Sequence, residues 1–125
     1  MCMERFYTDK ETIDLMVSDR NYFYKIVKKL KNGKYRSEYG SRIYEMGKWH
    51  DARPVNRPKN MNKTNTYYGG IHCIMDPPRS SGLFNKREGE IFVKVEVEDI
   101  VVVGVSFLYN ECLVAKRMRI IEEVA

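Results

Sequence analysis

The amino-acid sequence predicts an α+β domain, built as a mostly antiparallel, strongly curved sheet or half-barrel with one short N-terminal helix and two long loops. Residues 90–98 alternate apolar and polar side chains, as a strand with one buried and one solvated face does. Most other apolar residues fall in short β-branched or aromatic runs between turn residues. Convincing helical periodicity occurs only near the N-terminus, so strands dominate the expected fold.

The helix is expected over residues 9–18. Thr8-Asp9-Lys10-Glu11 has the form of a capping box, in which a Thr side chain and a Glu side chain satisfy the first amides of a helix. Ile13, Met16 and Val17 then share one face.

A hairpin follows the helix. Residues 22–30 are aromatic and β-branched, which favours a strand. Asn32-Gly33 is typical of a tight type I′ turn, so the chain is expected to fold back into a partner strand at 35–39. A further strand-like segment covers 42–46.

The remaining chain is expected to hold two loops among strands. The segment 52–66 contains two prolines and no acidic residue, and we expect a binding loop or a mobile loop there. Asp76-Pro77-Pro78 begins a second loop, 76–89, and Asn110-Glu111 is expected to form a turn. The strands expected in this part are 71–75, 90–98, 101–107 and 112–121.

Length and cysteine usage indicate one intracellular domain. The 125 residues are enough for a single core, with the helix in 1–20 and the sheet in 22–121. Cys2, Cys73 and Cys112 form no CxxC pair, so reduced thiols, no disulfides and no zinc site are expected. Neither a membrane helix nor a signal peptide is recognisable, which favours a soluble cytoplasmic protein.

Positive charge is concentrated in the middle of the chain. Residues 21–66 contain twelve Lys or Arg against three Asp or Glu, whereas the whole chain has a net charge of +5. Such a region attracts nucleic acid, nucleotides or an acidic protein surface. The alternative is a solvated face whose lysines protect exposed strands from aggregation.

The glycine pair before His72 marks the best candidate site. Gly69-Gly70 permits positive φ or a close approach of the backbone, and the following strand places His72 and Ile74 on one face. His72 is therefore a candidate acid/base or nucleotide contact, or a structural histidine that fixes the turn. Cys73 points to the opposite face, so His72 cannot activate its thiol.

Aromatic and cationic residues near the basic loop form a candidate ligand-binding set, because such side chains stack on bases and neutralise phosphates. The alternative is that the aromatic residues belong to the core. The set is Tyr44, Lys48, Trp49, Arg53, Arg57, Tyr68, His72 and Arg79.

No nucleotide-binding, metalloprotease or hydrolase motif occurs, and no metal or cofactor is expected. We therefore expect a non-catalytic domain that binds a macromolecule or a small anionic ligand through residues 48–68. The alternative is a nucleotide-acting transferase or hydrolase, with His72 as acid/base, Tyr44 or Tyr68 as a stacking wall and Arg79 as an anion clamp. That alternative requires a carboxylate near His72, for which Glu45, Asp51 and Asp76 are the candidates.

Several fragments in order resemble an uncharacterised small domain of tailed phages, prophages and large DNA viruses. They are Tyr24-Lys25, Tyr44-Glu45-Met46-Gly47-Lys48, Gly70-Ile71-His72, and a Val-Glu-Val strand followed by Ala-Lys-Arg and Ile-Ile-Glu-Glu. The resemblance covers residues 22–123 and implies a compact, mostly-β viral protein without an established activity. It favours an accessory role in host interaction or counter-defence, in the host cytoplasm, with a host or viral protein or a nucleic acid as partner.

The strand at 101–107 also predicts assembly. Val101, Val102, Val103, Val105 and Phe107 make it apolar on both faces, so both faces must be covered. Because the expected helix is too short to cover the sheet, either the sheet closes on itself or a second copy covers it, and we expect a homodimer.

Overall fold

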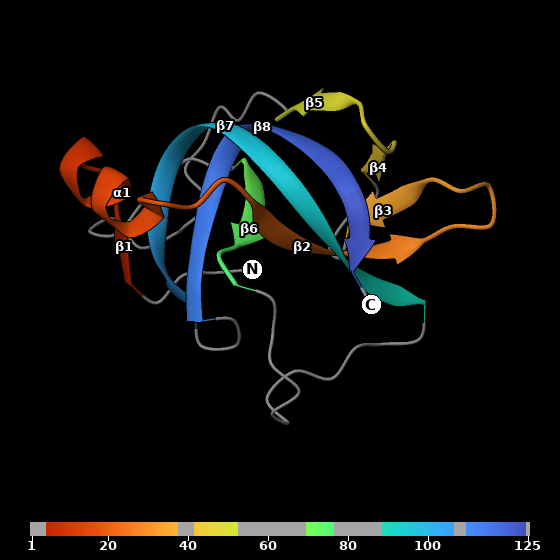
Figure 1. The fold of residues 1–125 in the computed structure, drawn as a ribbon, viewed down its shortest axis with the longest axis horizontal. Helices are drawn as coiled ribbons and strands as arrows, with labels where there is room; N and C mark the ends of the chain where they lie inside the picture. The colour runs from red at the N-terminus through yellow and green to blue at the C-terminus, as the bar shows by residue number, and fades with distance from the viewer. Residues whose placement is uncertain (1–4, 38–41, 53–69, 77–88, 107–109, 125) are drawn as a thin grey trace.

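The computed structural model describes residues 5–37, 42–52, 70–76, 89–106 and 110–124, and its elements are shown in Figure 1. In this part of the chain one short helix accompanies a curved, mostly antiparallel sheet, which confirms the coarse fold prediction. Most of the predicted loops 52–66 and 76–89 lies outside the described residues. The elements are β1 (Arg5–Tyr7), α1 (Lys10–Val17), β2 (Phe23–Lys29), β3 (Tyr35–Ser37), β4 (Ile43–Tyr44), β5 (Trp49–Asp51), β6 (Ile71–Ile74), β7 (Glu90–Ser106) and β8 (Asn110–Val124).

The sheet is organised around its two longest strands, β7 and β8, which pair along most of their length. The strand order is β1-β7-β8-β6-β2-β3-β4, and β5 pairs with β8 beside this path. β2 also pairs with β7, so the pairings run from β7 through β8, β6 and β2 and return to β7. This closed circuit explains the curvature seen in Figure 1.

Two apolar clusters lie against opposite faces of the strands. Val102 belongs to the smaller cluster and Val103 to the larger one, and both side chains are buried within a single chain. The chain's own elements therefore cover both faces of this stretch, and the homodimer stays a prediction. The larger cluster includes Phe23, Val27, Ile71, Cys73, Met75, Val93, Val95, Leu113, Met118 and Ile120, and the smaller one includes Ile26, Ile74, Phe92, Cys112 and Val114.

The strands predicted at 90–98 and 101–107 form one continuous strand, β7, as far as Ser106, and the separation was wrong; Phe107 lies outside the described residues. Asp99 has a φ of 57°, in the left-handed region, and the β7–β8 register shifts between Ile100 and Val102. An extra residue here produces a bulge that bends the strand without ending it, and Asp tolerates this conformation better than most residues. Phe92 is also buried, so the face expected to be solvated is partly apolar core.

The β2–β3 hairpin is confirmed, but its turn is not type I′. Only Gly33 of the central residues has positive φ, at 82°. The Gly33 amide donates to the Leu30 carbonyl, and the Leu30 amide donates to the Lys34 carbonyl. This is the three-residue connection in which a type I turn is followed by a left-handed glycine.

The N-terminal segment contains a helix and a strand. α1 agrees with the predicted helix, but Asp9, not Thr8, is the N-cap, because its carboxylate accepts the Thr12 amide at 2.9 Å. β1 precedes the helix and pairs with β7, and it was not predicted. Among the described residues, no helix has the length and apolar character needed to cross a membrane.

Two other boundaries differ from prediction. Trp49–Asp51, which directly precedes the basic loop and to which no strand was assigned, forms β5 against residues 117–119 of β8. Asn110 and Glu111, expected to form a turn, are the first residues of β8 and pair with β7. In both places long-range pairing overrides local turn preference.

Candidate functional site

The basic middle of the sequence folds into one region of the molecule, which we call the basic lobe: residues 21–37 and 42–52, comprising β2 to β5. It contains eight Lys or Arg against two acidic residues, a net charge of +6, whereas the other described residues sum to −5. Figure 1 shows the β2–β3 turn reaching out from the rest of the described chain. The positive charge is thus concentrated around a projecting hairpin.

Three cations of the hairpin form no ion pair with any described residue: Lys28, Lys31 and Arg36. Lys28 and Arg36 are exposed and lie directly opposite each other in the β2–β3 register, and Lys28 also lies opposite Glu90 in the β2–β7 register. Like charges in this position destabilise a sheet pair. Glu90 offsets part of this repulsion at Lys28, and the two exposed cations remain available to an anion.

Other cations of the lobe are engaged. Lys29 pairs with Glu123 at 3.0 Å, and Lys25 donates to the His72 carbonyl at 2.6 Å. Glu45 accepts Lys34 at 3.2 Å and Lys48 at 3.5 Å, which lowers the pKa of its carboxyl. This carboxylate connects the hairpin to the residue that precedes β5.

His50 holds the turn between β4 and β5 in its neutral form. Its Nε2 accepts the Glu45 amide at 3.0 Å, and its ring meets the Tyr44 ring edge-on at a centroid distance of 5.1 Å. Burial lowers the pKa of His50, and the nearby Arg42 and Lys48 cations lower it further.

We expect the free energy of unfolding to fall as pH is lowered from 7.5 to 5.5, in part through His50. The unfolded chain takes up a proton near pH 6.5, whereas the folded chain resists protonation because its pKa is lowered. This contribution is complete above about pH 6.5 and is lost as pH falls through the folded pKa. Urea unfolding across this range measures it, and His50→Gln, which cannot titrate, should show a shallower dependence. Equal dependence in both proteins would contradict the assignment.

Trp49 lies on β5 among paired charges, in a set we call the Trp49 cluster: Trp49, Asp51, Glu96, Glu98, Arg117 and Arg119. The Arg117 and Arg119 guanidinium carbons are 5.0 and 4.9 Å from the Trp49 ring centroid. Trp49 is half-buried and is opposite Arg119 in the β5–β8 register. Both distances are within the range of cation–π attraction.

Carboxylates hold both guanidinium groups of this cluster. Arg119 pairs with Glu96 at 2.5 Å, and Arg117 pairs with Asp51 at 2.8 Å and with Glu98 at 3.3 Å. The three carboxylates come from β5 and β7, on either side of β8. The indole therefore rests against cations whose positions are fixed from both sides.

The structure separates the predicted ligand residues. Lys48 and Trp49 are accessible, but Tyr44 is only 3% exposed and belongs to the core, so it cannot be a stacking wall. Arg117 and Arg119 were missed as site residues, because β5, the strand that brings Trp49 to them, was not predicted. The remaining predicted residues Arg53, Arg57, Tyr68 and Arg79 lie outside the described part of the chain.

His72 lies apart from this surface, on β6, where it pairs with Val114. The three carboxylates expected near it are engaged elsewhere. Glu45 binds two lysines and Asp51 binds Arg117, as described above. Asp76 binds Arg20 at 2.6 Å. These contacts bind each of the three carboxylates to a cation, and none of them brings a carboxylate to His72.

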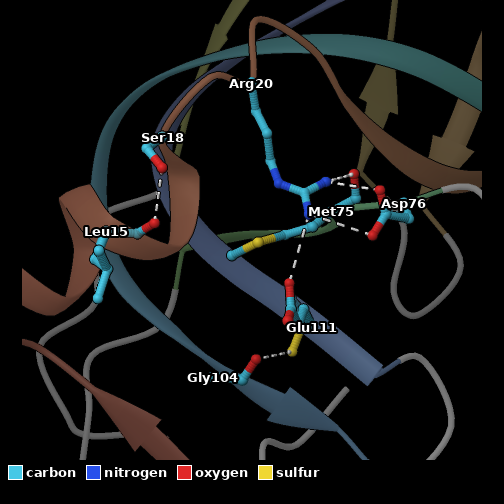
Figure 2. A network of polar contacts seen from close by, with 8 residues as sticks. Leu15, Ser18, Arg20, Met75, Asp76, Gly104 and Glu111 are labelled. Atoms are coloured by element: carbon cyan, nitrogen blue, oxygen red, sulfur yellow. Dashed lines mark hydrogen bonds and ion pairs between the residues drawn. The ribbon is translucent and has the colours of Figure 1, made fainter.

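Figure 2 shows the polar network around Arg20. The guanidinium of Arg20 donates to the Met75 carbonyl at 3.1 Å and pairs with Asp76, and it lies 3.6 Å from Glu111. The Met75 amide donates to the Glu111 carbonyl at 3.0 Å. Arg20 thus ties the segment after α1 to the end of β6 and the start of β8, a structural role.

The two described thiols are buried. Burial raises the pKa of Cys73 to about 11 and that of Cys112 to about 12, so neither is a thiolate at neutral pH. Cys73 Sγ lies 3.9 Å from Met118 Sδ, and Cys112 Sγ lies 3.7 Å from the Gly104 carbonyl. In the part of the chain that the structure describes, no three His, Cys, Asp or Glu side chains gather as a metal site would require.

Comparison with family models, with curated proteins and with solved structures gave no match to this chain.

Proposed function

We propose that this protein is a non-catalytic binding domain that holds an anionic partner on its basic lobe. The observation that carries the proposal is the pair Lys28 and Arg36, two exposed cations that face each other on adjacent strands without an ion-pair partner among the described residues. A fold that keeps this repulsion gains when phosphates or carboxylates neutralise it.

The rest of the molecule supplies a rigid support for that surface. In this proposal the closed circuit of strand pairings forms a half-barrel, and the β2–β3 hairpin projects from it. The resemblance to viral domains supports an accessory role in host interaction or counter-defence in the host cytoplasm. Catalysis by His72 remains the alternative, but no described contact favours it.

Salt dependence tests whether the lobe binds through anionic groups. We expect short oligonucleotides and acidic polymers to bind at 50 mM salt and to dissociate as salt is raised, because each phosphate contact releases condensed counterions. Fluorescence anisotropy of a labelled oligonucleotide measures this at several salt concentrations. Absence of any salt-sensitive binding would overturn the proposal.

A triple variant locates the surface. Lys28→Gln, Lys31→Gln and Arg36→Gln together should weaken binding at least tenfold and reduce the slope of log affinity against log salt by about 2 for a single strand. The fold should keep nearly the same stability, because the variant loses both the repulsion between Lys28 and Arg36 and the attraction between Lys28 and Glu90.

A matched control removes equal charge elsewhere. Arg5, Lys10 and Lys116 are exposed, lie outside the basic lobe and form no ion pair with a described residue. Their triple Gln variant should bind nearly as the unmodified protein does. An equal loss in both triple variants would show that net charge, not the hairpin surface, is responsible.

A further inference from the structure

We infer that the anionic partner is single-stranded nucleic acid, with the basic lobe holding its phosphates and Trp49 stacking against its bases. This inference rests on the proposed function and adds to it the class of ligand. Its central observation is that Trp49, a half-buried aromatic side chain of the lobe, is held by two arginines outside the basic region, whereas the more exposed Tyr22 lies against Lys94 at 4.9 Å.

The charge balance of the Trp49 cluster favours a base over a phosphate. Its two guanidinium groups face three carboxylates at salt-bridge distance, so the cluster has a net charge of −1 and offers no unpaired cation to a phosphate. A nucleobase is uncharged, so the net negative charge of the cluster does not repel it. Its ring can stack on the indole, and carboxylate oxygens can accept hydrogen bonds from its amino or ring N–H groups.

One carboxylate links the hairpin to the residue beside this ring. Lys48 directly precedes Trp49, and Glu45 holds both Lys48 and Lys34 of the hairpin. In this inference a strand bound by the hairpin continues past Glu45 to Lys48 and the indole. Alternation of charged groups with a stacking side chain is how proteins bind single strands without reading their sequence.

A duplex cannot use the same arrangement. Its bases already stack on one another, and unstacking one costs free energy that a phosphate-binding lobe does not recover. Single strands expose the faces of their bases. We therefore expect single strands to bind more tightly than duplexes of equal length, because they gain the stacking contact.

Trp49 is the chain's single tryptophan, so its fluorescence reports directly on stacking. Titration of the unmodified protein with oligothymidylate should quench the emission. An abasic oligomer of equal phosphate number should bind on the order of tenfold more weakly and leave the emission nearly unchanged. A duplex of equal length and inorganic polyphosphate should behave as the abasic oligomer does.

Two substitutions complete the test, measured by anisotropy of the labelled strand after circular dichroism confirms the fold. Trp49→Phe should retain the preference for oligothymidylate over the abasic oligomer, and Trp49→Leu should lose it while keeping the weaker, salt-sensitive binding. Equal affinity of the unmodified protein for both oligomers, without quenching, would overturn the stacking inference and leave the proposed function standing. Unchanged binding by the Lys28, Lys31 and Arg36 variant would overturn the proposed function itself.

Discussion

Replacing Met118 with alanine is expected to lower the free energy of unfolding by about 2–5 kcal/mol. Met118 is fully buried in the larger apolar cluster, and its sulfur lies 3.9 Å from that of Cys73 on β6. In the sheet register it faces His50 of β5 and Val97 of β7. Truncation therefore opens a cavity where three strands meet β8, and the surrounding backbone cannot close it.

Urea unfolding followed by Trp49 fluorescence measures this loss. Met118→Leu keeps nearly the same volume and should cost less than about 1.5 kcal/mol. Lys116→Ala, which truncates an exposed side chain two residues away, should change stability by about 0.5 kcal/mol or less. A Met118→Ala protein as stable as the Lys116→Ala protein would show that the β5–β8 junction is not well packed.

The sheet was predictable where local periodicity and burial agree. In 71–75, alternation placed Ile71, Cys73 and Met75 on one face and Ile74 on the other, and the two apolar clusters confirm this division. The hairpin position followed from Asn32-Gly33. These features depend on neighbouring residues, which the sequence displays directly.

Features that depend on long-range pairing were not predictable. Asp is a residue type that often occurs in turns, so Asp99 suggests the end of a strand. The pairing of β7 with β8 nevertheless continues past Asp99, and the chain forms a bulge there instead of a turn. β5 is three polar or aromatic residues that become a strand only because β8 offers an unpaired edge at Arg117–Arg119. Strand propensity in such segments is set by the partner rather than by the segment.

The candidate site also has a part that the sequence predicts and a part that depends on long-range contacts. Lys48 and Trp49 were recognised from composition, because cations beside aromatic residues suit a phosphate and a base. The sequence cannot show that Tyr44 turns into the core, or that Arg117 and Arg119, about 70 residues away, lie against the indole. The Lys and Arg residues from the middle of the chain lie on one part of the surface because β2 to β5 fold together in one lobe.

Replacing Gly70 with alanine is expected to destabilise the protein by about 1–3 kcal/mol. Gly70 directly precedes β6, and a Cβ atom there would stand 2.7 Å from the Val114 Cγ1 and 2.9 Å from the Ala115 carbonyl oxygen. The glycine is thus needed for close approach to β8, one of the two roles expected of the Gly-Gly pair. Val114 is fully buried and its β-branched side chain has few alternative rotamers, so the clash must move β6 away from β8.

A double-mutant cycle separates this clash from other effects of the substitution. Val114→Ala removes the Cγ1 atom, so Gly70→Ala should cost less in the Val114→Ala background than in the unmodified protein. The contact with the Ala115 carbonyl remains, and rescue should therefore be partial. Gly47→Ala is the control: its φ is 75° and no atom lies within 4 Å of its Cβ position, so its cost is backbone strain alone and should not depend on Val114. Urea unfolding of the four cycle members gives the coupling free energy, and a value near zero would show that β6 is not held against β8 at this contact.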